Sequence, residues 1–326
     1  MRNKNIPISF GPIPSRRLGR SLGINNIPAK ICSYSCIYCQ IGATNSLSIK
    51  RQEFFTPKEI YNEVAGKINQ LKNAGEQIDY LTFVPDGEPT LDVNLGETIE
   101  LLRPLGIKIA VITNSSLLWD KEVRKDLANA DWVSVKIDTV DEKIWHKIDR
   151  PNGKLKLLEI ISGIKTFVSF FKGVLVTETM LVQNMNDSKE SLRKTAQLIN
   201  ELNPYKAYIL IPTRPPAEKY VKPSSEENLN MAYQIFSDVV KNVELLAYNE
   251  GTNFFYSSYV EKELLSILAV HPMRKEATKM FLSKANADWS LIQALIGRNE
   301  LKEVKYAEDV FLVKVLGAGR KLESDL

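Results

Sequence analysis

Two hydrophobic periods alternate along the first 250 residues of the chain. Short runs rich in β-branched and aromatic residues predict strands, and between them apolar residues recur at helical spacing. We expect strands at residues 22–27, 80–85, 107–113, 132–137, 173–182 and 207–211, and helices at residues 56–75, 94–102, 120–128, 141–148, 156–170, 188–202 and 225–240. The alternation predicts an α/β fold in which six repeats form a partial (β/α)6 barrel, with no clear seventh or eighth repeat.

The pattern changes near residue 259. Three helical stretches (260–268, 274–283 and 289–296) precede two short β runs at 301–306 and 310–316. This order resembles a winged-helix module, which often reads nucleic acids. Residues 258–326 hold eleven basic and ten acidic residues, however, so packing or partner contact is an equally open role. We therefore divide the chain into residues 1–257, a barrel with a basic N-terminal segment, and residues 258–326, a winged-helix-like domain.

All three cysteines fall within eight residues, as Cys32, Cys36 and Cys39, and Tyr38 stands just before the last one. Three thiolates on one loop can ligate an iron–sulfur cluster. A structural zinc site would need a fourth ligand from elsewhere in the chain. A disulfide is unfavoured because the cysteine count is odd and no signal peptide precedes the loop. The spacing favours a cluster whose fourth iron lacks a protein ligand.

Charge is distributed unevenly although the formal net charge is only +4. The first 52 residues hold eight basic residues and no acidic one, and Arg16, Arg17 and Arg20 stand close together among prolines and glycines. These three arginines could lie over the open end of the barrel and bind a carboxylate or phosphate, or they could form salt bridges with acidic helices. No apolar run is long enough to span a membrane, and free thiols suit a cytoplasmic protein.

Polar residues follow the expected strands at their carboxyl ends, where parallel β/α folds carry their chemistry. Strand alternation puts Lys136 and Asp138 on one face together with Ser134, and charges buried in a barrel must be paired or functional. We expect Lys136 and Asp138 to be catalytic. The candidate cofactor-binding residues are Tyr38, Gly87, Glu88, Pro89, Asn114 and Ser134, and the candidate substrate-binding residues are Arg16, Arg17, Arg20, Arg150 and Arg214.

The C-x3-C-x2-C spacing with Tyr38 resembles the signature of the radical S-adenosylmethionine (SAM) superfamily. The turn at Gly87, Glu88 and Pro89 resembles the GE motif of that family. The resemblance implies a [4Fe-4S] cluster held by Cys32, Cys36 and Cys39, with SAM bound to the free iron and Tyr38 beside the adenine. It also implies reductive cleavage of SAM to a 5′-deoxyadenosyl radical, which needs an electron donor such as a ferredoxin or flavodoxin.

Within the superfamily, several stretches resemble the branch that contains 4-demethylwyosine synthase, which modifies a tRNA guanine. The likeness lies in residues 87–91, 111–114, 133–138 and 147–151; residues 11–23 instead resemble a separate radical SAM group with a single cluster. The synthase has a second cluster on three further cysteines, which this chain lacks. A tRNA nucleoside is the first candidate substrate, and a peptide or protein side chain is the second. A cluster-containing, DNA-binding regulator without enzymatic activity is the third hypothesis.

Overall fold

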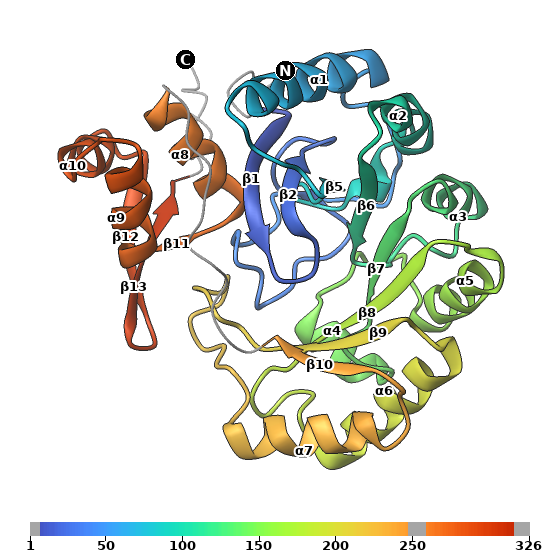
Figure 1. Cartoon of the computed structure of the whole chain (residues 1–326). Helices are drawn as coiled ribbons and strands as arrows, with labels where there is room; N and C mark the ends of the chain where they lie inside the picture. The colour runs from blue at the N-terminus through green and yellow to red at the C-terminus, as the bar shows by residue number, and fades with distance from the viewer. Residues whose placement is uncertain (1–6, 247–258, 316–326) are drawn as a thin grey trace, which may run out of the picture.

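The computed structural model describes residues 7–246 and 259–315, and its main element is one curved sheet (Figure 1). Within this part of the chain the sheet has eight strands in the order β1-β2-β5-β6-β7-β8-β9-β10. The strands from β2 to β10 run parallel, whereas β1 pairs antiparallel with β2. Their bounds are β1 Ser9–Ser15, β2 Gly19–Ile24, β5 Tyr80–Phe83, β6 Lys108–Thr113, β7 Trp132–Lys136, β8 Val174–Met180, β9 Lys206–Leu210 and β10 Val243–Leu246.

The expectation of six repeats and no seventh strand is wrong. β10 adds a seventh parallel strand beside β9, and β1 adds an antiparallel edge. β10 is only four residues long and just one of them, Leu246, is buried, so its hydrophobic signal is weak. The sheet is thus a partial barrel of the predicted α/β class with one more parallel repeat than predicted.

The helices cover the outer, convex face of this sheet (Figure 1). Thr56 caps the first of them through a reciprocal capping box with Glu59, as the sequence predicts. The helices are α1 Pro57–Asn73, α2 Leu95–Leu102, α3 Lys121–Ala128, α4 Glu142–Ile148, α5 Leu157–Phe170, α6 Lys189–Leu202 and α7 Glu226–Ser237. No helix in the described part of the chain combines the length and apolar content needed to cross a bilayer.

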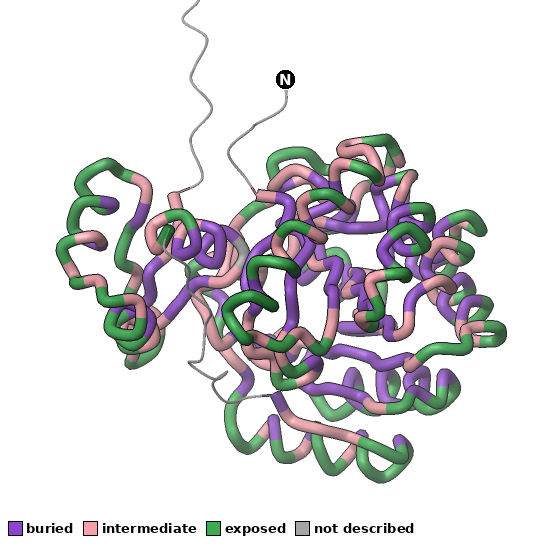
Figure 2. Tube along the Cα trace, turned by 45° about the horizontal axis from the view of Figure 1, so that its top comes forward, coloured by how far each residue is buried: buried purple, intermediate pink, exposed green. Residues whose placement is uncertain are grey.

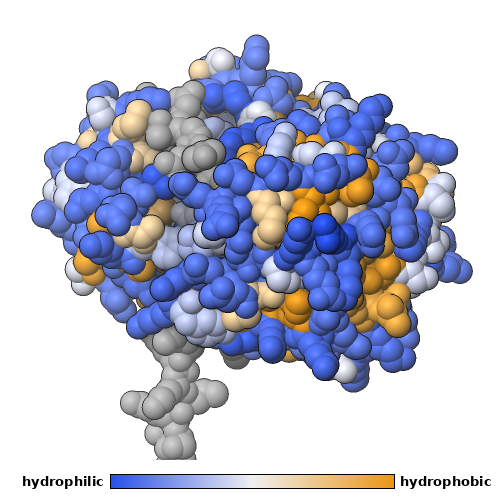
Figure 3. Space-filling model, turned by 90° about the horizontal axis from the view of Figure 1, so that it is seen from below, coloured by the Kyte–Doolittle hydropathy of each residue, from blue (hydrophilic) through white to orange (hydrophobic). Residues whose placement is uncertain are grey.

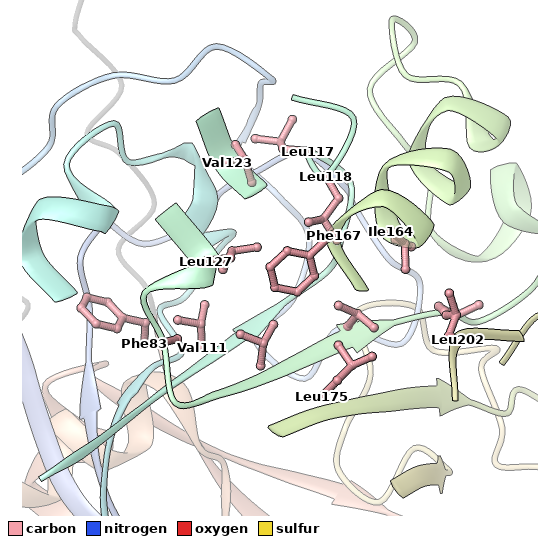
Figure 4. Packing of buried hydrophobic residues seen from close by; sticks show 14 of the residues in the cluster. Phe83, Val111, Leu117, Leu118, Val123, Leu127, Ile164, Phe167, Leu175 and Leu202 are labelled. Carbon is pink, nitrogen blue, oxygen red and sulfur yellow. The ribbon is translucent and has the colours of Figure 1, made fainter. Parts of the chain in front are cut away.

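The main core lies between the strands and these helices, where the Cα trace is mostly buried (Figure 2). Phe167 of α5 is fully buried and points toward Leu118 and Leu127 (Figure 4). Burying one such aromatic side chain contributes about 1.5–3 kcal/mol. The outer surface is largely polar, with separate hydrophobic patches on the face shown in Figure 3. This core fixes the strands whose carboxyl ends carry the candidate site.

A second apolar cluster fills the inner face of the sheet. Leu18, at the turn between β1 and β2, packs there with strand side chains that alternate with those of the main core and so point to the other face of the sheet. The other buried members are Ala110, Trp132, Val176, Tyr208 and Leu246. The β1–β2 turn lies at the amino end of β2, so the cluster closes the interior of the barrel at the end remote from the cysteines.

Residues 259–315 form a C-terminal module with its own core. It consists of α8 Val260–Val270, β11 Met273–Arg274, α9 Lys275–Lys284, α10 Ser290–Gly297, β12 Leu301–Tyr306 and β13 Asp309–Lys314. Its sheet is antiparallel in the order β11-β13-β12, and the short strand β11 was not expected from the sequence. The module stands beside β1 (Figure 1).

Candidate active site

The cysteine loop follows β2 and lies at the carboxyl end of the parallel strands. Two short strands, β3 (Ile31–Cys32) and β4 (Ser46–Leu47), pair at its base. Its backbone is fixed to the segment after α4, because the Ser35 N–H donates to the Asp149 carbonyl at 3.0 Å and the Ile37 N–H donates to the Ile148 carbonyl at 2.9 Å. All three cysteines are free and partly exposed at one surface.

Two thiols of this loop resist ionisation in the metal-free protein. Burial raises the pKa of Cys32 to about 12, and burial beside Asp149 raises the pKa of Cys36. Asn114 donates from Nδ2 to Cys32 Sγ at 3.4 Å. Metal binding has to displace the thiol protons, since only thiolates ligate iron. The loop therefore offers three sulfur ligands, of which Cys32 and Cys36 need a positive centre to become thiolates.

The GE turn packs directly against the start of the cysteine loop. A Cβ atom on Gly87 would lie 2.0 Å from the Ile31 carbonyl oxygen, so only glycine fits this approach. The Glu88 N–H donates to the same carbonyl at 3.2 Å. Pro89 begins the short 3-10 helix η1 (Pro89–Leu91), which carries the chain away from the loop. The turn and the cysteines thus face one site.

The Glu88 side chain points into the protein. It accepts hydrogen bonds from Thr113 Oγ1 at 2.6 Å and from the Asn114 N–H at 2.7 Å, and also from the N–H and hydroxyl of Thr90. These contacts join the turn to the end of β6 (Lys108–Thr113). Because these hydrogen bonds use the Glu88 carboxylate, the backbone groups of the turn are the ones that remain available to bind a ligand.

Replacing Glu88 by glutamine should lower the free energy of unfolding by about 1–3 kcal/mol. An amide can accept on only one of its two atoms, so either the Asn114 N–H, which donates to Oε2, or the Thr90 N–H, which donates to Oε1, would face another donor. Urea unfolding measures the loss. Glu97→Gln on the exposed face of α2 is the matched control, and equal stability of the two variants would contradict this account.

Asn114 and Ser134 lie in different parts of the site. Asn114 reaches the cysteine loop, where Nδ2 also donates to Ser33 Oγ at 2.9 Å. Ser134 is buried within the barrel and donates to Glu178 Oε1 at 2.7 Å. A role of Asn114 in cofactor binding stays a prediction supported by this position. Ser134 is placed to orient Glu178.

Lys136 and Asp138 come together in a buried charge network behind the cysteine loop. Burial lowers the pKa of Lys136, but the neighbouring Asp138 and Glu178 outweigh this effect and the net pKa is raised. The Lys136 ammonium lies 4.7 Å from the centre of the Tyr38 ring. Lys136 and Asp138 therefore attract each other within this network, while a catalytic role for either stays a prediction.

Tyr38 is a buried member of the same network. Its hydroxyl lies within hydrogen-bond distance of Asp138 Oδ2 and of Asp149 Oδ1, the latter at 2.9 Å, and the Cys36 thiol donates to Asp149 Oδ1 at 3.4 Å. These contacts tie the aromatic residue of the motif to the carboxylates next to one cysteine. The contact with adenine that the resemblance implies is not tested by this geometry.

Arg16, Arg17 and Arg20 do not lie over the open end of the barrel, as one of the two hypotheses expected. They occupy the β1–β2 turn and the first residues of β2, at the opposite end. Arg16 donates to the Leu246 carbonyl at 3.1 Å, Arg17 pairs with Glu178, and Arg20 pairs with Glu76. The alternative, pairing with acidic partners, describes Arg17 and Arg20. Glu178 is buried in the barrel, whereas Glu76 lies at the surface after α1.

The other two candidate arginines lie near the cysteine loop. Arg150 is exposed, pairs with Glu218 and donates to the Tyr220 hydroxyl at 3.1 Å. Arg214 donates to Gln40 Oε1 at 2.5 Å. Their substrate roles stay predictions.

Comparison with known families identifies the chemistry that this arrangement serves. The Radical SAM superfamily model matches residues 26–199, which include the cysteine loop, the GE turn and the strands from β5 to β8. The chain belongs to the radical SAM superfamily. The UPF0026 protein MJ1312 of Methanocaldococcus jannaschii is 48% identical over 309 residues, which span 94% of this chain and 96% of that protein.

Two further proteins are less similar to this chain. A GTPase Obg of Brachyspira hyodysenteriae is 31% identical over 88% of this chain, and the chain spans only 42% of that protein. A radical SAM methyltransferase from Sphaerobacter thermophilus shares the fold, with a TM-score of 0.52, 15% identity and coverage of 70% of this chain and 66% of that chain. The 4-demethylwyosine synthase branch is not established by these likenesses.

The protein is a radical SAM enzyme that uses a [4Fe-4S] cluster and SAM. This membership overturns the zinc-site and non-enzymatic regulator hypotheses. The site fits the cluster by the chemistry of its donors, because three free cysteines share one loop that packs against the GE turn. When bound, the cluster supplies the electron that cleaves SAM. Cys32, Cys36 and Cys39 would hold it, and Gly87 lets the turn approach the loop.

Several residues of the site could not be singled out from the sequence. Glu178 interrupts an otherwise apolar strand, VLVTETM, and Asp149 lies within a stretch that the family resemblance includes. The sequence signal for Glu178 and Asp149 was weak, because it consisted only of an acidic residue in a segment expected to be buried. Lys30 and Asp86, both buried, gave no signal because their burial depends on contacts between distant segments.

Proposed function

We propose that this enzyme abstracts a hydrogen atom from a nucleoside in a structured RNA, with tRNA as the first candidate. Reductive cleavage of SAM would supply a 5′-deoxyadenosyl radical, and an external ferredoxin or flavodoxin would supply the electron. The observation that carries the proposal is a rim of exposed cations around the cysteine loop. We call it the basic rim, and it consists of Lys50, Lys147, Arg150, Lys154, Lys219 and Lys222.

Backbone contacts bring the segments of the basic rim to the cysteine loop. The Asn152 N–H donates to the Ser33 carbonyl at 2.9 Å, and the Glu218 N–H donates to the Ile37 carbonyl at 3.0 Å. Asn152 Nδ2 also donates to the Leu47 carbonyl at 3.1 Å. Residues 147–154 and 218–222 therefore flank the loop, and residues 47–50 adjoin it. Exposed lysines that surround a reactive centre favour a polyanion over a small neutral substrate.

The basic N-terminal segment contributes Lys50 to this surface, but most of its other described cations are paired or buried. Arg17, Arg20 and Arg51 pair with acidic residues of the fold, and Lys30 is buried. In the basic rim Arg150 is likewise paired, with Glu218, whereas the five lysines form no ion pair within the described residues. The lysines therefore carry the argument for anion binding.

The closed interior of the barrel also supports a large substrate. Leu18 and Trp132 belong to the apolar cluster that fills the barrel at its amino end, so a reacting group reaches the cofactors from the carboxyl end. A base that projects from a folded RNA suits such a shallow site, because enzymes that act on bases turn them out of the stack. The helix and strand order of the C-terminal module, αβααββ, resembles that of a winged helix, and this resemblance supports the proposal of nucleic-acid binding.

The proposal predicts salt-sensitive tRNA binding that depends on the basic rim. A triple variant, Lys147→Gln, Lys154→Gln and Lys219→Gln, should weaken binding at least tenfold and reduce the slope of log K against log salt by about 2. The matched control replaces Lys72, Lys172 and Lys241, which are exposed at the amino ends of the strands, and should leave both quantities unchanged. Binding is measured anaerobically across a salt series.

Mass spectrometry of tRNA nucleosides from cells with and without the gene identifies the product. Loss of one modified nucleoside would support the proposal. Equal tRNA binding by the rim variant and its control, together with an unchanged nucleoside profile, would contradict it. That result would favour the alternative substrate, a peptide or protein side chain, since winged-helix-like modules also bind peptides.

A further inference from the structure

The C-terminal module is fixed firmly to the barrel. Helix α8 packs along β1, and Lys67 of α1 pairs with Glu263 of α8, both with side chains about one-tenth exposed. Ile13 of β1 packs against the core of the module. Figure 1 shows the module next to the hairpin of β1 and β2. A buried ion pair and a shared apolar contact indicate a fixed position rather than a tethered domain.

Two side chains of the module contact the loop that follows β9. His271, directly after α8, has its Nε2 atom 3.1 Å from Arg214 Nη2. Tyr306 donates from its hydroxyl to the Pro212 carbonyl at 3.0 Å. Arg214 also donates to Gln40 Oε1 at 2.5 Å, and Gln40 is the residue after Cys39. The chain of contacts from His271 through Arg214 thus ends beside a cluster ligand.

We propose that the C-terminal module is part of the cofactor site, in which His271 and Tyr306 act as positioning residues. His271 contacts Arg214 and, through Gln40, the end of the cysteine loop. Tyr306 holds the Pro212 carbonyl and with it the loop that carries Arg214. Outer contacts of this kind orient metal ligands and tune the metal centre. The proposal concerns cluster and SAM binding, so its test is independent of the RNA substrate.

The test uses the full-length, anaerobically reconstituted protein and two variants, His271→Ala and Tyr306→Phe. Each should raise the dissociation constant of SAM, measured by equilibrium dialysis with the oxidised cluster, by about tenfold. Each should also change the electron paramagnetic resonance spectrum and midpoint potential of the reduced cluster. His271→Gln should restore most of the wild-type behaviour, because its amide can still bond to Arg214.

The controls are His146→Ala on α4 and Tyr233→Phe on α7, which replace exposed residues of the same types. Both should bind SAM as the wild type does. Wild-type affinity and spectrum in His271→Ala and Tyr306→Phe would overturn the proposal. So would a fall in thermal stability alone, since that marks a merely structural role. If His271→Ala does not fold, Tyr306→Phe and His271→Gln decide the question.

Discussion

Replacing any one of Cys32, Cys36 and Cys39 by alanine is expected to abolish cluster assembly and SAM cleavage. Two sulfur ligands cannot hold a cluster that needs three, and the neighbouring carboxylate Asp149 is already bonded to Tyr38 and Cys36. Iron and sulfide content should fall to background after anaerobic reconstitution. Release of 5′-deoxyadenosine with dithionite and SAM should fall by at least about 10³-fold, the scale for loss of an essential catalytic group.

Ser35→Ala within the same loop is the control. Its hydroxyl accepts only a 3.3 Å hydrogen bond from the Thr44 N–H, so this variant should assemble a full cluster and retain activity. The same measurements apply to both. Full cluster content in a cysteine variant would show that the ligand assignment is wrong.

Replacing Lys136 by methionine is expected to lower the free energy of unfolding by about 1–3 kcal/mol, the cost of leaving buried polar groups without a favourable partner. Asp138 and Glu178 would lose their shared cation in a buried environment. Arg17 still faces Glu178, but Asp138 would keep only the hydrogen bonds from Tyr38 and from the Met180 N–H. Urea unfolding of the metal-free protein measures the effect.

A partly exposed pair supplies the comparison. Lys206 contacts Glu244 at 2.6 Å with side chains 31% and 40% exposed, and such pairs contribute only about 0–1 kcal/mol. Lys206→Met should therefore be nearly neutral. Lys136→Arg should keep part of the stability lost in Lys136→Met. If the two methionine variants lost equal stability, the network around Lys136 would not be a buried charge cluster.

Local patterns predicted most elements and failed where the signal was short. The helix from Pro57 to Asn73 was predicted because its cap and its apolar spacing are local. β10 and β11 were missed because four and two residues respectively carry little periodicity. Only the β2 half of the β1–β2 hairpin was predicted, because the proline- and glycine-rich sequence of β1 resembles a loop.

The sequence by itself determined that three cysteines share one loop and that a GE turn follows a strand, because these features depend on fixed spacings within short segments. Only the tertiary structure decided which charges meet: Arg17 and Glu178 are 161 positions apart, yet they pair inside the barrel. It also decided that exposed lysines of three separate loops flank the cysteine loop, whereas most described cations of the basic N-terminal segment are paired or buried. The physical reason is that strand register and loop packing bring distant residues together, and no local pattern encodes either.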